Sequence, residues 1–259
     1  TNGTGVLTFS GNISSGGGAN SITLVGPGIV SFTGTNTYSG DTVLQNGTLR
    51  LSTVTPATSC LSNSARILIA SNAVLDVSLI SGFTLASGQT LRGVGTVNGD
   101  LTVGSGASLA VGWADSAALG VLTNNGNLTL AGTTVLRLNR TNSPNSDCCV
   151  CGGTVACGGT LTLSNVGSPF QTGDTFTLFQ AGSGTTLGFA SVSPATPGNG
   201  LAWDFSQLSL GIVSVTSASA TPVISPQLAN QTAECGKNVT YAAFATGSGT
   251  LHYQWSVNG

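Results

Sequence analysis

The sequence predicts an all-β fold made of many short strands, and three observations support this prediction. Apolar and polar residues alternate over short runs, which is the period of a strand with one buried and one solvated face. Glycine, which occurs 38 times, and asparagine separate these runs. Only 5% of the residues are charged, whereas long surface helices need many charged residues on their outer faces. We therefore expect almost no helix.

The expected strands are short runs in which apolar residues occupy alternate positions. Because their ends carry Gly or Asn, we expect tight turns between them. Along the chain these strands fall at residues 6–9, 22–24, 29–32, 48–51, 74–77, 101–103, 109–111, 128–130, 135–138, 161–163 and 176–179.

Two architectures fit many short strands: an antiparallel sandwich or barrel, and a parallel β-helix in which each coil lies on the preceding one. A similar unit of Gly followed by apolar and polar residues recurs at 47–49, 126–128 and 159–161. Such units at irregular spacing are typical of stacked coils with loops of different length. The pattern favours a parallel β-helix, or solenoid, over residues 1–217.

The composition of the sequence and the length of the predicted strands change after this region. Residues 218–222 are small and polar and end in Pro222, so we expect a linker there. Beyond it, longer strands are expected at 239–245 and 251–255. The chain therefore divides into a long stacked domain and a C-terminal segment, 223–259.

One segment of the predicted stack, Gly26 to Leu51, resembles the autotransporter-associated β-strand repeat. This resemblance covers 26 of the 259 residues, and Asp41 stands where the repeat has Gly or Thr. Residues 119–215 resemble the final coils that follow such repeats in large bacterial surface proteins. The resemblance implies a right-handed β-helix, exported and serving as a stalk or scaffold, with no catalytic residues. The matching positions are Gly26, Gly28, Gly34, Asn36, Tyr38, Gly40, Thr42, Val43, Gly47, Leu49 and Leu51.

The C-terminal segment, Pro222 to Gly259, resembles the start of a bacterial immunoglobulin-like domain, with Tyr-Gln-Trp at 253–255. Such a sandwich needs about 100 residues, so we expect only its N-terminal part within 223–259. Further chain of the same polypeptide, or a neighbouring copy, would supply the rest. Ala243 stands where a buried cysteine often sits, so the usual inter-sheet disulfide is not expected.

The chain has six cysteines, an even number that suits disulfides in an oxidising compartment. Strand alternation puts Cys149 and Cys151 on one face and Cys148 on the other, and adjacent cysteines do not match zinc-motif spacing. We expect disulfides, with a zinc site or free buried thiols as alternatives. The disulfide candidates are Cys60, Cys148, Cys149, Cys151, Cys157 and Cys235.

Polysaccharide lyases and hydrolases also use β-helices, and they need clustered carboxylates. Asp76 and Asp100, flanked by Arg66 and Arg92, form the best such constellation in the sequence. Because aspartate often serves only to bind turn amides, we expect no catalytic residue, metal or cofactor. Trp113, in a predicted loop, is the one candidate ligand contact.

Charge and hydropathy limit the classes of partner. The net charge is -2 and no Lys/Arg cluster is present, which excludes a phosphate-binding surface for nucleic acid. No run of about eighteen apolar residues occurs, so no membrane-spanning helix is expected. The chain does not begin with Met and carries no signal peptide, which indicates a mature or excised piece of a longer precursor.

These expectations lead to a non-catalytic structural or adhesive scaffold of a large secreted bacterial protein at the cell surface. A subunit of an extracellular filament, assembled by strand addition or solenoid stacking, is the first alternative. A β-helical polysaccharide lyase or hydrolase is the second. The expected partners are the longer polypeptide or neighbouring copies, through the C-terminal segment and the coil near 6–9, together with surface glycans.

Overall fold

The computed structural model describes residues 5–52, 61–113, 118–186 and 188–219, together with 223–224, 232–234, 236, 245–246, 254 and 256. Regular structure in these residues is almost entirely β-strand, with one 3-10 helix, η2 (Leu208–Leu210). The predicted all-β class is confirmed. None of the helical segments in these residues has the length and apolar character needed to cross a bilayer.

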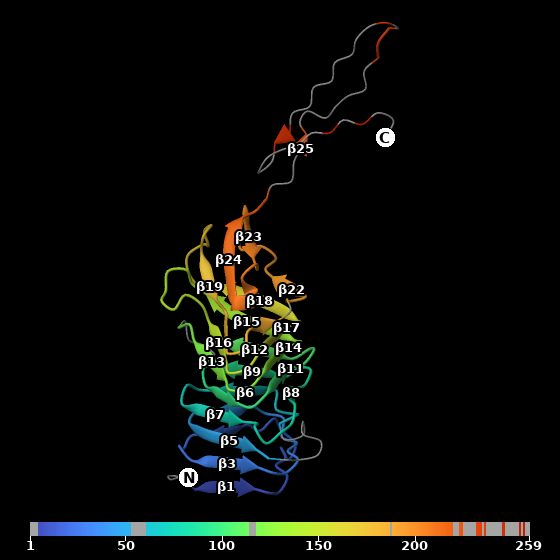
Figure 1. The fold of residues 1–259 in the computed structure, drawn as a ribbon. Helices are drawn as coiled ribbons and strands as arrows, with labels where there is room; N and C mark the ends of the chain where they lie inside the picture. Colours follow the sequence, from blue (N-terminus) through green and yellow to red (C-terminus); the bar gives the residue numbers. More distant parts are fainter. Residues whose placement is uncertain are drawn as a thin grey trace.

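Three parallel sheets form most of the molecule (Figure 1). Sheet 1 has the order β1 (Val6–Phe9), β3 (Ile29–Phe32), β5 (Gly47–Leu51), β7 (Ala73–Asp76), β10 (Thr96–Asn98), β13 (Val121–Asn124), β16 (Cys148–Cys151), β20 (Phe179–Ala181). Sheet 2 has the order β2 (Ile22–Leu24), β4 (Thr42–Leu44), β6 (Arg66–Ile69), β9 (Thr90–Gly93), β12 (Ser108–Val111), β15 (Thr133–Leu138), β18 (Thr160–Asn165), β22 (Ser191–Ser193). Sheet 3 has the order β21 (Thr185–Thr186), β17 (Val155–Cys157), β14 (Leu128–Leu130), β11 (Leu101–Val103), β8 (Phe83–Leu85).

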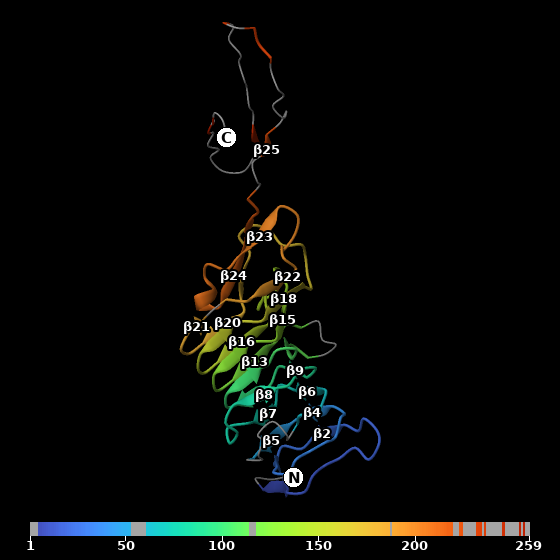
Figure 2. The ribbon, with the colours of Figure 1, turned by 90° about the vertical axis from the view of Figure 1, so that its right-hand side faces the viewer.

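The chain visits these sheets in rotation. It runs from a strand of sheet 1 to one of sheet 2 and back, and from β7 onward it also passes through sheet 3. We call one such passage a circuit. Each circuit pairs in parallel with the preceding one, and partners in sheet 1 lie 19 residues apart at Ile29 and Thr48 and 30 apart at Cys149 and Phe179. The circuits are stacked along one axis (Figures 1 and 2), so the antiparallel alternative is wrong for the residues of these three sheets.

The core lies between the three sheets and follows the period-two pattern. In sheet 1 the residues Leu49, Leu75 and Val97 are paired in succession, and all three are fully buried. Sheet 2 continues the same rule with Leu91 and Leu109. Identical apolar positions of successive circuits therefore lie above one another, which makes one continuous core.

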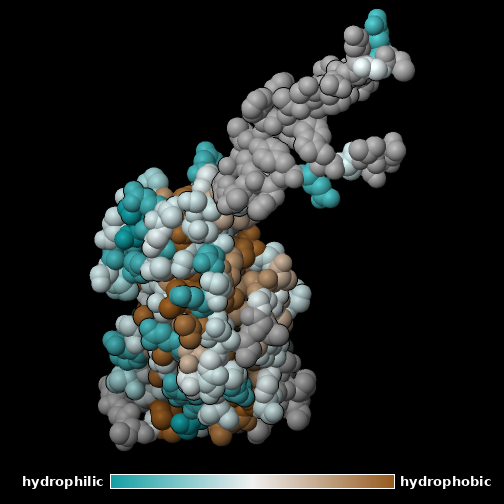
Figure 3. All heavy atoms as spheres, turned by 45° about the horizontal axis from the view of Figure 1, so that its top comes forward, coloured by the Kyte–Doolittle hydropathy of each residue, from teal (hydrophilic) through white to brown (hydrophobic). Residues whose placement is uncertain are grey.

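The outer surface carries few strongly hydrophilic residues. Figure 3 shows pale, weakly polar residues over much of the visible side, with hydrophilic and hydrophobic residues between them. On sheet 3 the outward column is Thr84, Thr102 and Thr129, which pair in succession. Ser, Thr and Gly thus provide the polar face that charged residues provide in most proteins, as the low charge content indicated.

Several residues of segment 26–51 have packing roles. Tyr38 is 2% exposed, and its hydroxyl lies 2.6 Å from Thr42 Oγ1. Asn36 is equally buried, and its Oδ1 accepts the amide of Ile13 from the preceding circuit at 3.0 Å. Gly47 has φ +75° and lies against carbonyl groups of the circuit below, where a side chain would not fit. Asn36 therefore joins two circuits, and Gly47 allows two circuits to approach closely.

The C-terminal end of the stack is closed by a different sheet. β19 (Thr175–Thr177), β24 (Ile212–Ser217) and β23 (Leu201–Asp204) pair in antiparallel fashion. The predicted strand 176–179 is therefore two strands, β19 in this sheet and β20 in sheet 1. Residues 175–217, predicted as further coils, thus include an antiparallel cap that covers the last circuit, because an end circuit otherwise leaves its core exposed.

Little of the predicted C-terminal segment lies in the described residues. β25 (Val223–Ile224) pairs in antiparallel fashion with β26 (Ala245–Thr246). Most of the predicted strand 239–245 and all of the strand 251–255 except Gln254 lie outside the described residues, as do Cys60 and Cys235. The immunoglobulin-like expectation therefore stays a prediction.

Candidate functional site

The N-terminal end of the stack is open. β1 and β2 are the outermost strands of sheets 1 and 2, so each has one edge with no strand partner among the described residues. Leu7 and Phe9 pair with Val30 and Phe32 and occupy the same inward column. Phe9 is nevertheless 43% exposed, whereas Phe32 is 1% exposed. The difference arises because, among the described residues, no strand pairs with the outer edge of β1.

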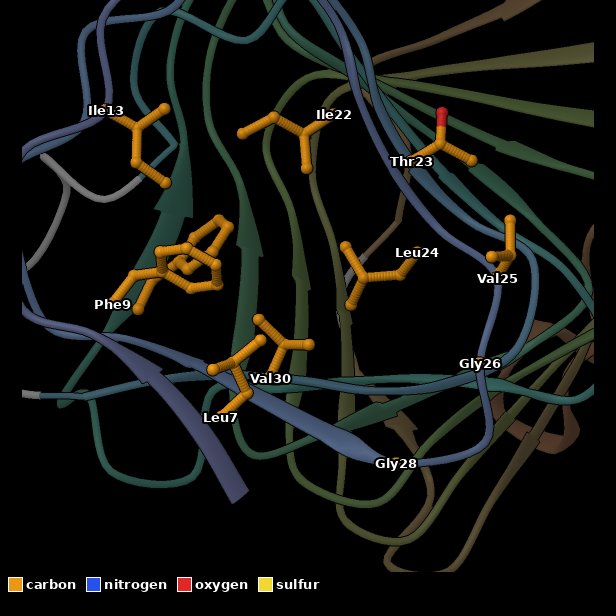
Figure 4. Close-up of a pocket in the computed structure, with 11 residues that line it drawn as sticks. Leu7, Phe9, Ile13, Ile22, Thr23, Leu24, Val25, Gly26, Gly28 and Val30 are labelled. Atoms are coloured by element: carbon orange, nitrogen blue, oxygen red, sulfur yellow. The ribbon is translucent and has the colours of Figure 1, made fainter. Parts of the chain in front are cut away.

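This open end forms an apolar hollow with a volume of about 450 Å³. Figure 4 shows the side chains of Phe9, Ile13, Ile22 and Leu24 around the same space, with Leu7 and Val30 at its lower side. Thr23 is the only polar residue apart from glycine among the lining residues. The hollow is therefore an uncovered end of the apolar core in the described residues.

The opposite end is covered. Within the cap, Phe176 of β19 and Val213 and Val215 of β24 are almost fully buried, and Leu208 of η2 is 7% exposed. Phe170 packs edge-to-face on Phe176, with ring centroids 5.4 Å apart. Among the described residues the two ends of the stack therefore differ: the apolar side chains at β1 are exposed, whereas those at the cap are buried.

A second hollow lies beside the last circuit, between β20, β21 and η2. Its volume is about 480 Å³, and Val150, Phe179 and Thr185 are among its lining residues. Leu210 at this hollow is 69% exposed. None of the described residues that line this hollow is charged, and Cys151, Gln180 and Ser209 are among them.

The four described cysteines are free thiols and all are buried: Cys148, Cys149, Cys151 and Cys157. The expected disulfides are not found among them. Cys149 and Cys151 are two positions apart on β16, where parallel side chains of an extended strand lie about 6.6 Å apart, beyond the short Cβ–Cβ distance that a disulfide requires. No group of three or more possible metal ligands occurs in the described residues.

Burial raises the pKa of three of these thiols. It raises the pKa of Cys157 to about 12, and burial together with the charge of Asp147 raises the pKa of Cys148 to about 11. The pKa of Cys149 is also raised well above its ordinary value, mainly by burial. Since the thiolate is the nucleophile and metal ligand, a raised pKa disfavours the reactive form of Cys148, Cys149 and Cys157.

The candidate catalytic constellation does not come together. Asp76 pairs with Arg50 at 3.0 Å and accepts the Ser78 hydroxyl at 2.6 Å. Burial alone would raise the pKa of Asp76, but the hydrogen bonds from Ser78 and Arg50 outweigh it and lower the pKa. Asp100 instead accepts the amide of Asn127 at 2.7 Å. The two carboxylates therefore bind different neighbouring groups in different parts of the stack.

The two arginines that flank this pair in the sequence are also occupied elsewhere. Arg66 pairs with Asp41 at 2.7 Å, one circuit earlier. Arg92 donates from Nε to the carbonyl of Gly112 at 3.3 Å. Each of the four charged groups thus has a local partner of its own.

The most buried charged pair was not singled out from the sequence. Asp147 is fully buried and lies 2.8 Å from Nε of Arg137, whose side chain is 13% exposed. The carboxylate also accepts the amides of Gly120 and Arg137 at 2.7 and 2.9 Å, and Arg137 donates to the carbonyl of Ala118. This pair joins two neighbouring circuits. Arg137 and Asp147 are ten residues apart in the sequence, a spacing that is typical of neither a helical pair nor a metal-binding motif.

Trp113, the candidate ligand contact, is half-buried and follows Gly112, which has φ +105°. Residues 114–117 lie outside the described residues, so its loop is described only in part. Trp203, by contrast, is part of the cap: its indole donates to the carbonyl of Pro194 at 3.0 Å and its ring packs on Phe170.

Comparison with known families gives no assignment. No protein-family profile matches the sequence, and no curated protein matches it significantly. The functional argument therefore depends on the chain itself.

Proposed function

We propose that residues 5–217 form a right-handed parallel β-helix that serves as a non-catalytic structural or adhesive scaffold of a secreted bacterial surface protein. The resemblance of segment 26–51 to the autotransporter-associated repeat and the rotation of the chain through three parallel sheets support the β-helix. The sparsely charged, Ser- and Thr-rich outer faces suit an extracellular location.

One observation carries the non-catalytic part of this proposal. Every described aspartate is bound to a neighbouring group that holds the fold together. The pairs are Asp41 with Arg66, Asp76 with Arg50, Asp100 with Asn127, Asp147 with Arg137, Asp174 with Arg140, and Asp204 with the amide of Ser206. Carboxylates held in this way are poorly placed to act together as acid and base.

The alternative of a β-helical lyase or hydrolase is tested by assay. We expect no turnover of a panel of acidic and neutral polysaccharides, measured by reducing ends and by formation of unsaturated products. The matched variants are Asp76→Asn and Asp100→Asn. Turnover by the unaltered chain that either substitution abolishes would establish the enzyme and defeat the scaffold proposal.

An adhesive role is tested by binding to surface glycans on an array, with Trp113→Ala beside Trp203→Phe as the control for aromatic content. Adhesion through the loop at Trp113 requires that only the first substitution weakens binding. A scaffold without adhesive function gives no glycan binding for any of the three chains.

The filament alternative rests on the open end of the stack, where β1 and β2 have unpaired edges among the described residues. Exposed strand edges recruit other strands. The C-terminal segment 223–259, proposed as the start of an immunoglobulin-like domain, would supply such strands from a neighbouring copy. Deleting residues 218–259 abolishes assembly if this route is used.

A further inference from the structure

The outer face of sheet 2 carries an apolar column where a solvated strand face usually carries polar residues. The residues of this column are half-buried, whereas the residues on either side of each along its strand point inward and are buried. On sheet 3 the outward column is made of threonine instead. The column lies on middle strands of the sheet, β4 to β15. Its members pair in succession: Val43, Leu68, Arg92, Ala110 and Val135.

A column of hydroxyl groups runs beside the apolar column. On the strands β9, β12, β15 and β18 the outward residues that form it also pair in succession: Thr90, Ser108, Thr133 and Thr160. Neighbouring strands lie about 4.7–4.9 Å apart, so both columns repeat at this interval along the stack. A sugar ring presents C–H groups on its faces and hydroxyl groups at its edge. An apolar column beside a hydroxyl column therefore offers both packing and hydrogen bonds to a polysaccharide.

Arg92, in the middle of the apolar column, differs from the other described arginines. Each of those four pairs with an aspartate at 2.7 to 3.0 Å. Arg92 has no carboxylate partner among the described residues, and its Nε donates only to the carbonyl of Gly112, at 3.3 Å. Its pairing neighbours Leu68 and Ala110 have no acceptor in their side chains. The other N–H donors of this guanidinium are therefore available to a ligand.

The surroundings of Arg92 carry an excess of positive charge. The guanidinium of Arg137 also lies against Gly112, where a side chain would not fit. Asp147 neutralises Arg137, so two guanidinium groups and one carboxylate leave one positive charge in this part of the described surface. The half-buried Trp113 follows Gly112 directly and adds an aromatic residue. Charge complementarity therefore favours an anionic ligand that also has apolar faces.

We propose that this face of sheet 2 binds an acidic polysaccharide, with a uronate carboxylate on Arg92 and sugar rings along the apolar and hydroxyl columns. Guanidinium and carboxylate groups are both planar and form two parallel hydrogen bonds. Because both columns run across the strands, the polysaccharide lies along the axis of the stack. The inference rests on the adhesive part of the function proposed above and names the class of ligand.

Isothermal titration calorimetry with polygalacturonate measures this binding. Arg92→Gln is expected to raise the dissociation constant about tenfold, because it removes a charge-assisted pair of hydrogen bonds. Arg92→Lys keeps the charge but loses the fork of donors, so it should recover only part of the affinity. Arg66→Gln is the matched control. It makes the same change of charge on the neighbouring strand β6, where Asp41 holds the side chain, and should leave the dissociation constant unchanged.

Two further measurements separate a specific site from general attraction between charges. The methyl ester of polygalacturonate has the same sugar rings without the negative charge, and it should bind far more weakly. Val135→Thr should weaken binding of polygalacturonate because it places a hydroxyl in the apolar column. Val74→Thr, at a half-buried outward position of sheet 1, is its control and should have no effect. Circular dichroism of each variant verifies that it folds.

Three results would overturn the inference. The first is an Arg92→Gln variant that binds polygalacturonate as tightly as the unaltered chain. The second is equally tight binding of dextran sulfate, which would indicate attraction to anions in general. The third is no binding of polygalacturonate. If neutral glycans bind instead, the adhesive function stands without this ligand class. If no glycan binds, the adhesive function fails as well, and the scaffold remains.

Discussion

Replacing Arg137 by leucine is expected to destabilise the middle of the stack. Asp147 is fully buried and holds four hydrogen bonds, from the amide of Gly120 and from the amide, Nε and Nη2 of Arg137. The substitution keeps much of the apolar stem of the side chain. It removes the positive charge and leaves the carboxylate buried with only its two amide donors.

The magnitude follows from the burial of the pair. Removing one partner of a buried ion pair costs about 3–5 kcal/mol, because the other charge stays in the interior without compensation. The two amide donors to Asp147 remain and offset part of this loss. We therefore expect the free energy of unfolding to fall by about 3 kcal/mol. Asp147→Asn in the Arg137→Leu background removes the charge and should restore part of the loss.

Urea unfolding followed by circular dichroism measures the change. Arg66→Leu is the matched control, because its pair with Asp41 is exposed, with side-chain exposures of 62% and 20%. This control should not move the unfolding midpoint measurably, since exposed ion pairs contribute little. High salt should leave the effect of Arg137→Leu intact, because a buried pair is screened little.

Two outcomes would refute this reasoning about the buried pair. One is an Arg137→Leu midpoint that shifts no more than the midpoint of Arg66→Leu. The other is an effect that vanishes in molar salt, which would place the pair in contact with solvent.

Three further predictions concern single buried groups. Thr134→Val should raise the free energy of unfolding by about 1 kcal/mol, because Oγ1 of Thr134 is buried with no hydrogen-bond partner among the described residues. Urea titrations measure this change, and a loss of stability would contradict the prediction. The lowered pKa of Asp76 means that its stabilising contribution is present above the unfolded pKa and is lost as the pH falls through the lower folded pKa. Acid titrations of stability should therefore be shallower in Asp76→Asn. With the pKa of Cys148 at about 11 and that of Cys157 at about 12, native protein at pH near 8 should resist alkylation at both thiols, whereas unfolded, unreduced protein should react fully; peptide mapping that finds disulfides would contradict it.

Much of the parallel stack could be predicted from local pattern. The strands at 6–9, 22–24, 29–32, 101–103 and 128–130 have the predicted bounds, because alternation and flanking Gly or Asn act within a few residues. Parallel stacking followed from the similar repeated units. The prediction of a single strand at 176–179 was wrong. Phe176 belongs to the cap and Phe179 to sheet 1, and this division depends on where the stack ends.

The candidate sites were harder to predict. Asp76 and Asp100 are about one circuit apart in sequence, yet each is bound by a different neighbour. Circuits in sheet 1 vary from 19 to 30 residues between partners, so a fixed spacing does not place two side chains at the same height. The buried pair of Arg137 and Asp147 depends on a loop that returns between circuits, which no local pattern reports.

The sequence by itself determined the all-β class, the inward and outward faces of the strands and the low charge of the surface, because these follow from residue type and a period of two. Tertiary structure alone decided which strands lie next to each other, which end is covered, and which thiols and charges are buried. Those properties depend on contacts between residues about 20 or more positions apart along the chain. Leu7 and Phe9 illustrate the distinction: their alternation assigns them to the core, and only the end of the stack leaves them exposed.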